Sequence, residues 1–188
     1  KHYNTKYLPK AGDVEILKST TKSKSYISIS SAELKNGNDV FVIGFPHGDE
    51  VSTYPRITPG IVNSNVGLNN NFDEFIFDAI TYPGSSGSPV LNKSGLLVGI
   101  LYGGYVHVLR DSEGEIKNII NDPNESYGIK SSYLMKFLNI NNIPYKKTKR
   151  SSKLQTEQIS SKNTPSTRLI ECYRLAEQWK ISLEKIHL

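Results

Sequence analysis

The sequence predicts an all-β protein that carries a helical extension at its C-terminal end. Turn-forming residues recur along the first 145 residues, and short runs rich in β-branched and aromatic residues lie between them, which is typical of a β-barrel. The turn signals are Asn36-Gly37, Pro46-His47-Gly48, Asn69-Asn70-Asn71, Pro83-Gly84, Asn92-Lys93-Ser94-Gly95, Glu113-Gly114 and Asp122-Pro123-Asn124. Helical spacing of apolar residues appears only after these turns.

The predicted elements follow one another in a simple order. Two apolar runs, 75–82 and 90–104, are bounded by turns and predict a strand, a turn and a second strand. Residues 131–138 change to helical spacing, with Ser131 or Ser132 as the N-cap. A barrel that ends in a short helix is therefore expected up to about residue 145.

The last forty residues have a different character. Residues 146–163 are polar and basic and predict a solvated linker. Contact with nucleic acid or a membrane surface is the alternative for such a run, but the linker is favoured, because the net charge of the whole chain is only +5 and no aromatic residues interleave in this run. Residues 164–188 predict an amphipathic helix, with Thr164 as its cap and Pro165 at its first position. Its wide apolar stripe needs a partner surface, either the barrel or another chain of a larger assembly.

Composition restricts the class of protein further. The 188 residues allow one or two domains, and no run of about 18 apolar residues predicts a membrane span. Cys172 is the single cysteine, so a disulfide framework is excluded. We expect a cytoplasmic location, with secretion as the alternative, and we expect no cofactor and no metal ion.

The most informative segment is Pro83-Gly84-Ser85-Ser86-Gly87-Ser88-Pro89. Glycine permits the backbone conformations of a sharp turn and lets a substrate carbonyl approach main-chain N–H groups. Ser86 is the candidate nucleophile, and the N–H groups of Gly84 and Ser86 are the candidate oxyanion hole beside its hydroxyl. The flanking strands set this serine in a hairpin, unlike the strand-to-helix turn of α/β-hydrolases.

The stretch from Asp78 to Gly104 resembles the trypsin-like, chymotrypsin-fold serine peptidases of the bacterial high-temperature-requirement and glutamyl endopeptidase types. Three further segments match that family in the same order along the chain. They are residues 38–48, similar to the opening strand of the second barrel, residues 57–62, similar to its T-x-G-x-V strand, and residues 12–18, similar to the D-x-A-x-L-K segment of the triad aspartate. The resemblance spans roughly residues 10 to 145.

The resemblance implies a chymotrypsin-like double β-barrel in which the second barrel is complete and the first contributes only its last part. Residues 1–23 would end the first barrel and carry the triad aspartate. Residues 24–145 would form the second barrel with the nucleophile and a short terminal helix. Residues 146–163 would be the basic linker, and residues 164–188 the amphipathic helix.

The resemblance also implies a mechanism. Asp13 would orient a histidine, that histidine would take the proton of Ser86, and the two N–H groups would hold the oxyanion. Only His2 precedes Asp13, and the family places its histidine in a first barrel that twenty residues are too few to close. His47 and His107 match no catalytic position, so we expect the histidine to come from an upstream segment or a companion chain.

The resemblance also implies a substrate pocket. The predicted substrate-binding residues are Ile80, Leu101, Tyr102, Gly103 and Gly104. Ile80 supplies no carboxylate for a basic substrate residue, and Leu101 stands where glutamyl endopeptidases carry a histidine. We therefore expect a pocket for an uncharged, apolar side chain, unless the carboxylate of Asp78 turns inward and favours basic substrates.

Two functions of different classes remain open. The first is a serine endopeptidase that acts on a protein or peptide substrate. The second is a non-catalytic, protease-like module that binds a partner within a larger assembly. The complete set of Gly84, Ser86 and Gly87 favours the enzyme, because a binding module has no physical need for an oxyanion turn beside a serine.

Overall fold

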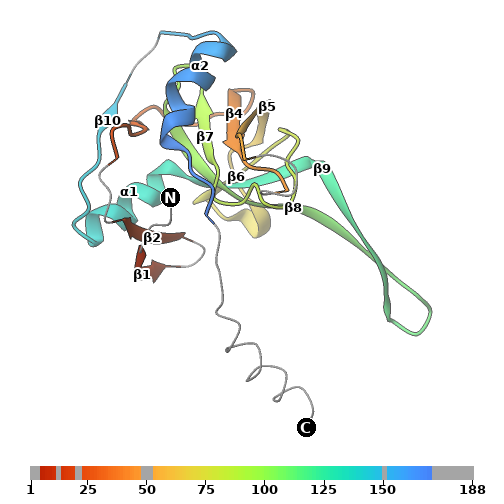
Figure 1. The fold of residues 1–188 in the computed structure, drawn as a ribbon. Helices are drawn as coiled ribbons and strands as arrows, with labels where there is room; N and C mark the ends of the chain where they lie inside the picture. The colour runs from red at the N-terminus through yellow and green to blue at the C-terminus, as the bar shows by residue number, and fades with distance from the viewer. Residues whose placement is uncertain (1–4, 12–13, 20–22, 48–52, 150–151, 171–188) are drawn as a thin grey trace.

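The computed structural model describes residues 5–11, 14–19, 23–47, 53–149 and 152–170 (Figure 1). The strands are β1 (Thr5–Ala11), β2 (Val14–Ser19), β3 (Ile29–Ser30), β4 (Asp39–Gly44), β5 (Arg56–Ser64), β6 (Glu74–Phe77), β7 (Pro89–Asn92), β8 (Leu97–Arg110), β9 (Ile116–Lys130) and β10 (Lys147–Thr148). The helices are α1 (Ser131–Ile140), α2 (Thr156–Asn163) and the 3-10 helices η2 (Leu68–Asn70) and η3 (Thr164–Ser166). Strands dominate these ranges, so the predicted all-β class is confirmed.

Six of the strands close into an antiparallel barrel. Neighbouring strands follow the order β8, β7, β4, β5, β6 and β9, and the additional pairing of β8 with β9 completes the circle. Gly128 of β9 lies opposite both Phe75 of β6 and Leu101 of β8. A side chain at Gly128 would collide with the ring of Phe75. Glycine is needed at this position because an aromatic ring fills the barrel beside it.

Strand β4 explains why the barrel has an apolar face on each side. Successive side chains of a strand point in opposite directions, so Val40 and Val42 pack inside the barrel while Phe41 and Ile43 pack outside it. The interior cluster contains Leu34, Val40, Val42, Val62, Phe75, Phe77, Ala79, Val90, Val98 and Leu101. The outer cluster contains Val14, Ile29, Phe41, Ile43, Leu91, Leu97, Ile129, Leu134, Phe137 and Ile159.

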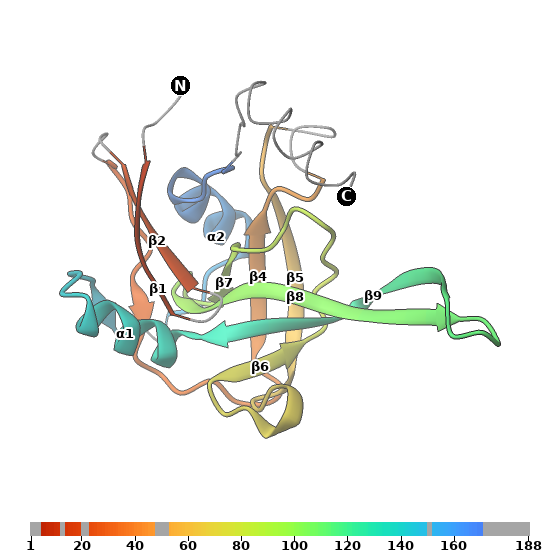
Figure 2. The ribbon, with the colours of Figure 1, turned by 90° about the horizontal axis from the view of Figure 1, so that it is seen from below.

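The outer face is covered by three separate elements. Val14 of the β1–β2 hairpin, Leu134 and Phe137 of α1, and Ile159 of α2 are all buried in the outer cluster. Figure 2 shows the hairpin and the two helices on one side of the barrel. The short strands β3 and β10 pair in parallel at the edge of the sheet, next to β8. Among the described residues, the barrel therefore has one covered side and one side without such a layer.

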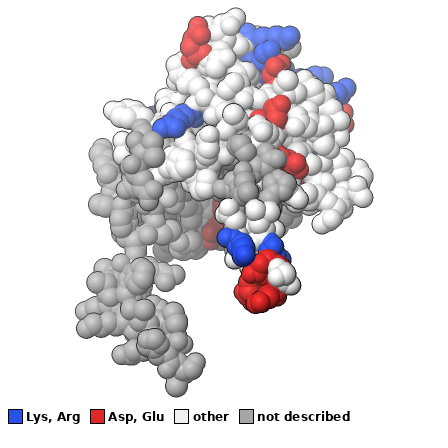
Figure 3. Space-filling model, turned by 90° about the vertical axis from the view of Figure 1, so that its right-hand side faces the viewer, with Lys and Arg blue, Asp and Glu red and all other residues white. Residues whose placement is uncertain are grey.

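Strands β8 and β9 extend well beyond the barrel as a two-stranded arm (Figures 1 and 2). Their pairing continues from Gly104 and Ser126 in the barrel wall to Arg110 and Ile116 at the tip. Figure 3 shows acidic and basic side chains together on the projecting tip, where the sequence from 110 to 117 supplies three carboxylates and two cations. Several apolar side chains of the arm are exposed, namely Tyr105, Val108, Leu109 and Ile116.

The helix expected at 131–138 is confirmed as α1, but neither predicted serine caps it. Lys130 is the N-cap, and α1 begins at Ser131 without a capping hydrogen bond from a side chain. The chain enters α1 directly from β9, where the N–H of Lys130 donates to the carbonyl of Asp73 and its Nζ to the carbonyl of Phe72. Burial lowers the pKa of Lys130, although the carboxylates of Asp73 and Glu33 act in the opposite direction.

The segment expected to be a linker differs from a solvated chain in its second half. Residues 156–163 form α2, which starts with a reciprocal capping box between Gln155 and Gln158. Ile159 is fully buried in the outer cluster, and Nδ2 of buried Asn163 donates to the carbonyl of Ile159 at 2.9 Å. A single apolar side chain and side-chain capping thus stabilise a helix that the polar composition of this segment does not predict.

The predicted helix at 164–188 is described only at its beginning. Thr164–Ser166 form η3 with Pro165 in its first turn, and residues 167–170 continue without regular structure. Residues 171–188, which include Cys172, lie outside the described residues. Among the described helices, none combines the length and the apolar character that crossing a membrane requires.

Candidate active site

The turn that carries Ser86 connects β6 and β7 and is built on two glycines. Gly84 has φ 91° and Gly87 has φ 87°, a region of backbone space that favours glycine. The N–H of Ser85 donates to the carbonyl of Tyr82 at 3.0 Å, and the N–H of Ser88 donates to the carbonyl of Ser85 at 3.1 Å. Glycine therefore stands on either side of Ser85 and Ser86 because the turn requires a positive φ at both positions.

Strand β8 holds the other side of this turn. The N–H of Gly87 donates to the carbonyl of Leu101 at 2.7 Å, and the N–H of Leu101 donates to the carbonyl of Ser88 at 2.9 Å. The exposed hydroxyl of Ser86 donates to the carbonyl of Tyr102 at 3.2 Å. This distance is longer than the usual range of about 2.5–3.0 Å for an O–H···O bond. The Ser86 hydroxyl is thus oriented by a weak bond that a stronger acceptor can replace.

Two amides of the turn stand out because they have no acceptor in the described part of the chain. The N–H groups of Ser85, Gly87 and Ser88 all donate to carbonyls, whereas those of Gly84 and Ser86 do not. Both residues are exposed, so these donors are open to solvent or to a ligand. The sequence prediction assigned the oxyanion hole to the same two amides.

The predicted substrate residues on β8 are divided by the strand's alternation. The side chain of Leu101 is only 2% exposed and packs inside the barrel, so the expectation that it contacts substrate is corrected. Tyr102 offers its carbonyl to Ser86, while its ring stacks on Tyr127 and its hydroxyl donates to Oε2 of Glu74 at 2.8 Å.

Gly103 and Gly104 of β8 differ in how much free space lies beside them. A side chain built at Gly103 would meet no atom within 4 Å, whereas one at Gly104 would approach the carbonyl of Glu125 at 3.3 Å. Their role in binding a substrate stays a prediction.

The predicted triad partners of Ser86 are described only in part. Asp13 and His2 lie outside the described residues, and so does the side chain of His107 in β8. His47 has a positive φ of 62°, its N–H donates to the carbonyl of Pro83 at 2.7 Å, and its ring lies 5.2 Å from that of Tyr82. In the described ranges the Ser86 hydroxyl bonds to the Tyr102 carbonyl and to no imidazole.

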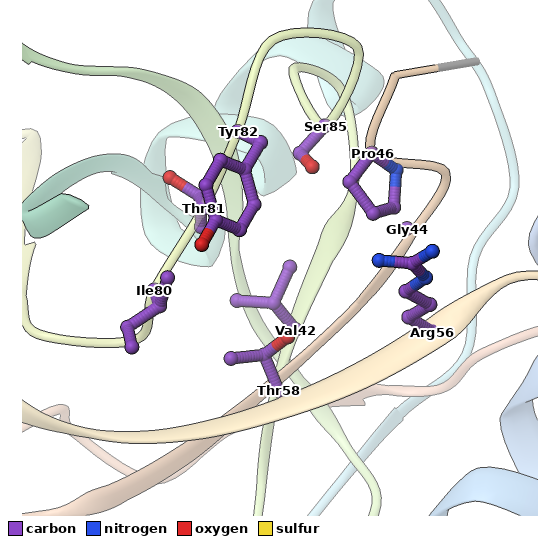
Figure 4. Close-up of a pocket in the computed structure, with 9 residues that line it drawn as sticks. All are labelled: Val42, Gly44, Pro46, Arg56, Thr58, Ile80, Thr81, Tyr82 and Ser85. Atoms are coloured by element: carbon purple, nitrogen blue, oxygen red, sulfur yellow. The ribbon is translucent and has the colours of Figure 1, made fainter. Parts of the chain in front are cut away.

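A small pocket of about 110 Å³ lies on the β4–β5 side of the turn. Figure 4 shows its lining residues, which are Val42, Gly44, Pro46, Arg56, Thr58, Ile80, Thr81, Tyr82 and Ser85. Of the five predicted substrate-binding residues, only Ile80 belongs to this set. Ser86 is also not part of it, although its neighbour Ser85 is. In this pocket Ile80 is therefore not accompanied by the glycines of β8.

Sequence reasoning missed Arg56, the charged member of the lining set within the described ranges. It follows Pro55 at the first position of β5 and belongs to no recognisable motif. Sequence reasoning also left Asp78 open. Its Oδ1 accepts the N–H of Ile61 at 2.5 Å, and its own N–H donates to the Ile61 carbonyl at 3.1 Å. The carboxylate of Asp78 is thus turned to β5.

The described residues contain no cluster of metal-ligating side chains.

Comparisons with known proteins agree with this architecture. The family model "Trypsin-like peptidase domain" matches residues 4–100. The protein "Serine protease HtrA-like" of Staphylococcus haemolyticus is 34% identical in an alignment over 106 residues that covers 47% of this chain. The matched part is only 16% of the length of that relative.

Solved structures show the same fold at low sequence identity. The active form of the Rv3671c protease from M. tuberculosis superposes with a TM-score of 0.55 at 16% identity, over 78% of this chain and 62% of that chain. The HtrA-type protease AlgW, solved with a decapeptide, superposes with a TM-score of 0.53 at 18% identity, over 72% of this chain and 39% of that chain. The predicted chymotrypsin-like fold class is confirmed by these neighbours.

Proposed function

The chain belongs to the trypsin-like peptidase domain family, and from this premise we propose that it cleaves peptide bonds with Ser86 as the nucleophile. The observation that carries the proposal is the arrangement of the 83–89 turn. An exposed hydroxyl held by one weak hydrogen bond lies in the same turn as two amides that have no acceptor among the described residues. Acyl transfer requires both a nucleophile and donors for the charge that develops on the substrate carbonyl.

The proposed reaction follows the serine protease mechanism. The Ser86 hydroxyl loses its proton to a histidine as its oxygen attacks the substrate carbonyl, and the N–H groups of Gly84 and Ser86 hold the resulting oxyanion. The histidine then gives the proton to the leaving amine, and water completes the cycle by the same route. Asp13 is the proposed partner that orients the histidine.

The source of the histidine is part of the proposal. His47 has its ring against Tyr82 and its amide bound to Pro83, so both interactions tie it to the start of the turn. We assign the general base to a histidine of an upstream segment or of a companion chain. Such a segment would lie against the exposed Ser86, on the opposite side of the turn from buried Ser85.

We propose a protein or peptide substrate with an uncharged residue before the scissile bond. The carboxylate of Asp78 already accepts a hydrogen bond from Ile61, which argues against a basic residue there. Leu101 supplies no imidazole for a glutamate, and its side chain is inside the barrel. A peptide panel that varies this one residue tests the assignment, and the highest kcat/KM for a lysine or glutamate peptide would contradict it.

A fluorophosphonate probe tests the nucleophile directly in the protein purified from its natural source, with every segment and companion chain that it carries. We expect covalent labelling at Ser86, none in the Ser86→Ala variant, and unchanged labelling in the matched control Ser112→Ala, whose serine is exposed at the arm tip. Equal labelling of the wild type and Ser86→Ala would show that Ser86 is not the reactive residue.

One observation favours the second function, a non-catalytic binding module. In the described ranges the Ser86 hydroxyl is bonded to a backbone carbonyl rather than to a base. If the natural protein binds peptides but is not labelled by the probe, the binding module is the better description. If labelling and peptide hydrolysis are both lost in Ser86→Ala, the endopeptidase is the better description.

A further inference from the structure

The pocket beside the nucleophile turn has features of a binding site that the proposed hydrolysis does not use. Ser86 does not line it, and neither does Tyr102, whose carbonyl holds the Ser86 hydroxyl. Its walls come from β4, β5 and residues 80–85. Its chemistry can therefore be considered separately from that of Ser86.

One lining residue carries a hydroxyl group that has no hydrogen-bond partner in the described part of the chain. Ser85 is only 5% exposed, and Figure 4 shows its hydroxyl pointing into the pocket. Its neighbour Thr81 is different, because the hydroxyl of Thr81 is already hydrogen-bonded to that of Ser126 at 2.8 Å. Because the Ser85 hydroxyl faces the pocket and donates to no acceptor among the described residues, it can donate to an acceptor from outside the protein.

The second feature is positive charge. Arg56 is the charged side chain of the lining set, and among the described residues its guanidinium forms no ion pair with a carboxylate. The guanidinium matches the planar geometry of a carboxylate and cannot lose its charge in a protein. A hydroxyl donor and a guanidinium at one pocket both favour an anion.

The size of the pocket limits what it can hold. Its volume is about 110 Å³. Pockets for drug-sized ligands begin at about 300 Å³. The pocket therefore suits a small planar anionic group, and any larger part of the ligand would lie outside it.

We propose that this pocket binds a carboxylate group, which accepts hydrogen bonds from the guanidinium of Arg56 and the hydroxyl of Ser85. The carboxylate can belong to an acidic side chain, to the C-terminal end of a peptide, or to a small free acid. Because Arg56 is exposed, we expect weak binding, on the order of a millimolar dissociation constant for an isolated carboxylate.

Nuclear magnetic resonance titration of the whole chain with acetate, at constant ionic strength, tests the proposal. We expect saturable shifts of the backbone amides of residues 80–85, and none with acetamide, a neutral molecule of the same size. N-acetylglutamate amide and N-acetylglycine then compare a side-chain carboxylate with a C-terminal one, and the tighter binder identifies the source.

Variants separate the pocket from general charge effects. Arg56→Gln should weaken acetate binding roughly tenfold, and Ser85→Ala should weaken it severalfold, because each removes one donor to a charged acceptor. Arg110→Gln, at the exposed arm tip, is the matched control and should leave binding unchanged. The dispersion of the amide spectrum verifies that each variant is folded. If Arg56→Gln does not fold, the acetate affinity of Ser85→Ala alone tests the proposal.

Three outcomes would overturn the proposal. They are equal shifts with acetate and acetamide, equal acetate affinity in the wild type and both pocket variants, and shifts spread over the surface without saturation. The Ser86→Ala variant should bind acetate like the wild type. A failure of peptide hydrolysis therefore leaves the titration informative, and a failure of the titration leaves the role of Ser86 untouched.

Discussion

The inner and outer halves of the β8–β9 ribbon share one hydrogen-bonded ladder but differ in what covers them. In the barrel wall Leu101 lies opposite Gly128 and is buried, whereas in the arm Val108 and Leu109 are 42% and 48% exposed. A two-stranded ribbon alone is marginal in water, and apolar burial contributes most of the stability of a fold. Hydrogen bonding thus determines where a strand runs, and burial determines whether it stabilises the protein.

The largest expected effect is in the barrel interior. Phe75 is fully buried, stacks on Phe77 and fills the space that Gly128 leaves open. Phe75→Ala should lower the free energy of unfolding by about 3–5 kcal/mol, through lost burial and a cavity that the closed barrel cannot collapse. Urea denaturation measures this change. A loss below about 1 kcal/mol would mean that the interior is far less rigid than a packed core.

The outer cluster should respond less strongly, because helices can shift where a closed barrel cannot. Ile159 of α2 is fully buried against it. Ile159→Ala should cost about 2–4 kcal/mol if α2 is an integral layer of the fold. The matched control is Ile170→Ala, an exposed isoleucine beyond α2, which should change stability by less than about 0.5 kcal/mol. Equal effects of the two substitutions would show that α2 is not anchored by this contact.

Overfilling the barrel should have a smaller effect than emptying it. Gly128→Ala pushes a methyl group toward the ring of Phe75 and should cost about 1–3 kcal/mol. If the collision is the cause, Phe75→Leu in the same chain should recover part of the loss, and a double-mutant cycle of unfolding free energies measures that coupling. Strict additivity of the two substitutions would assign the cost to the backbone of β9 instead.

The barrel and the nucleophile turn could be predicted because their signals are local. The uninterrupted apolar run from Val40 to Ile43 indicates a strand that is buried on both faces, and the positive φ angles of Gly84 and Gly87 explain why glycine stands at those positions. The α1 helix was equally readable from its spacing. These features depend on a few consecutive residues, so the sequence displays them without knowledge of the fold.

The remaining features depend on contacts between distant segments. Helix α2 has a single buried apolar residue, Ile159, and only its contact with the barrel distinguishes it from a linker. Leu101 was expected to face substrate, but the register of β8 turns it inward. The Arg56 pocket joins three separate segments, so no window of sequence contains it. No pattern in residues 105–122 predicts that β8 and β9 extend beyond the barrel.

The smallest expected effect is in the arm formed by the outer halves of β8 and β9. Val108→Ser replaces a side chain that is already 42% exposed, so it should change the free energy of unfolding by less than about 0.5 kcal/mol. Val98→Ser makes the same chemical change ten residues earlier on β8, where the side chain is 4% exposed inside the barrel. There it should cost more than about 2 kcal/mol, since apolar burial is lost and a hydroxyl is buried. Urea denaturation of the two variants measures the difference on one ladder. A similar loss for both would mean that a surface beyond the described residues covers the arm, because the exposed fraction of Val108 cannot account for it.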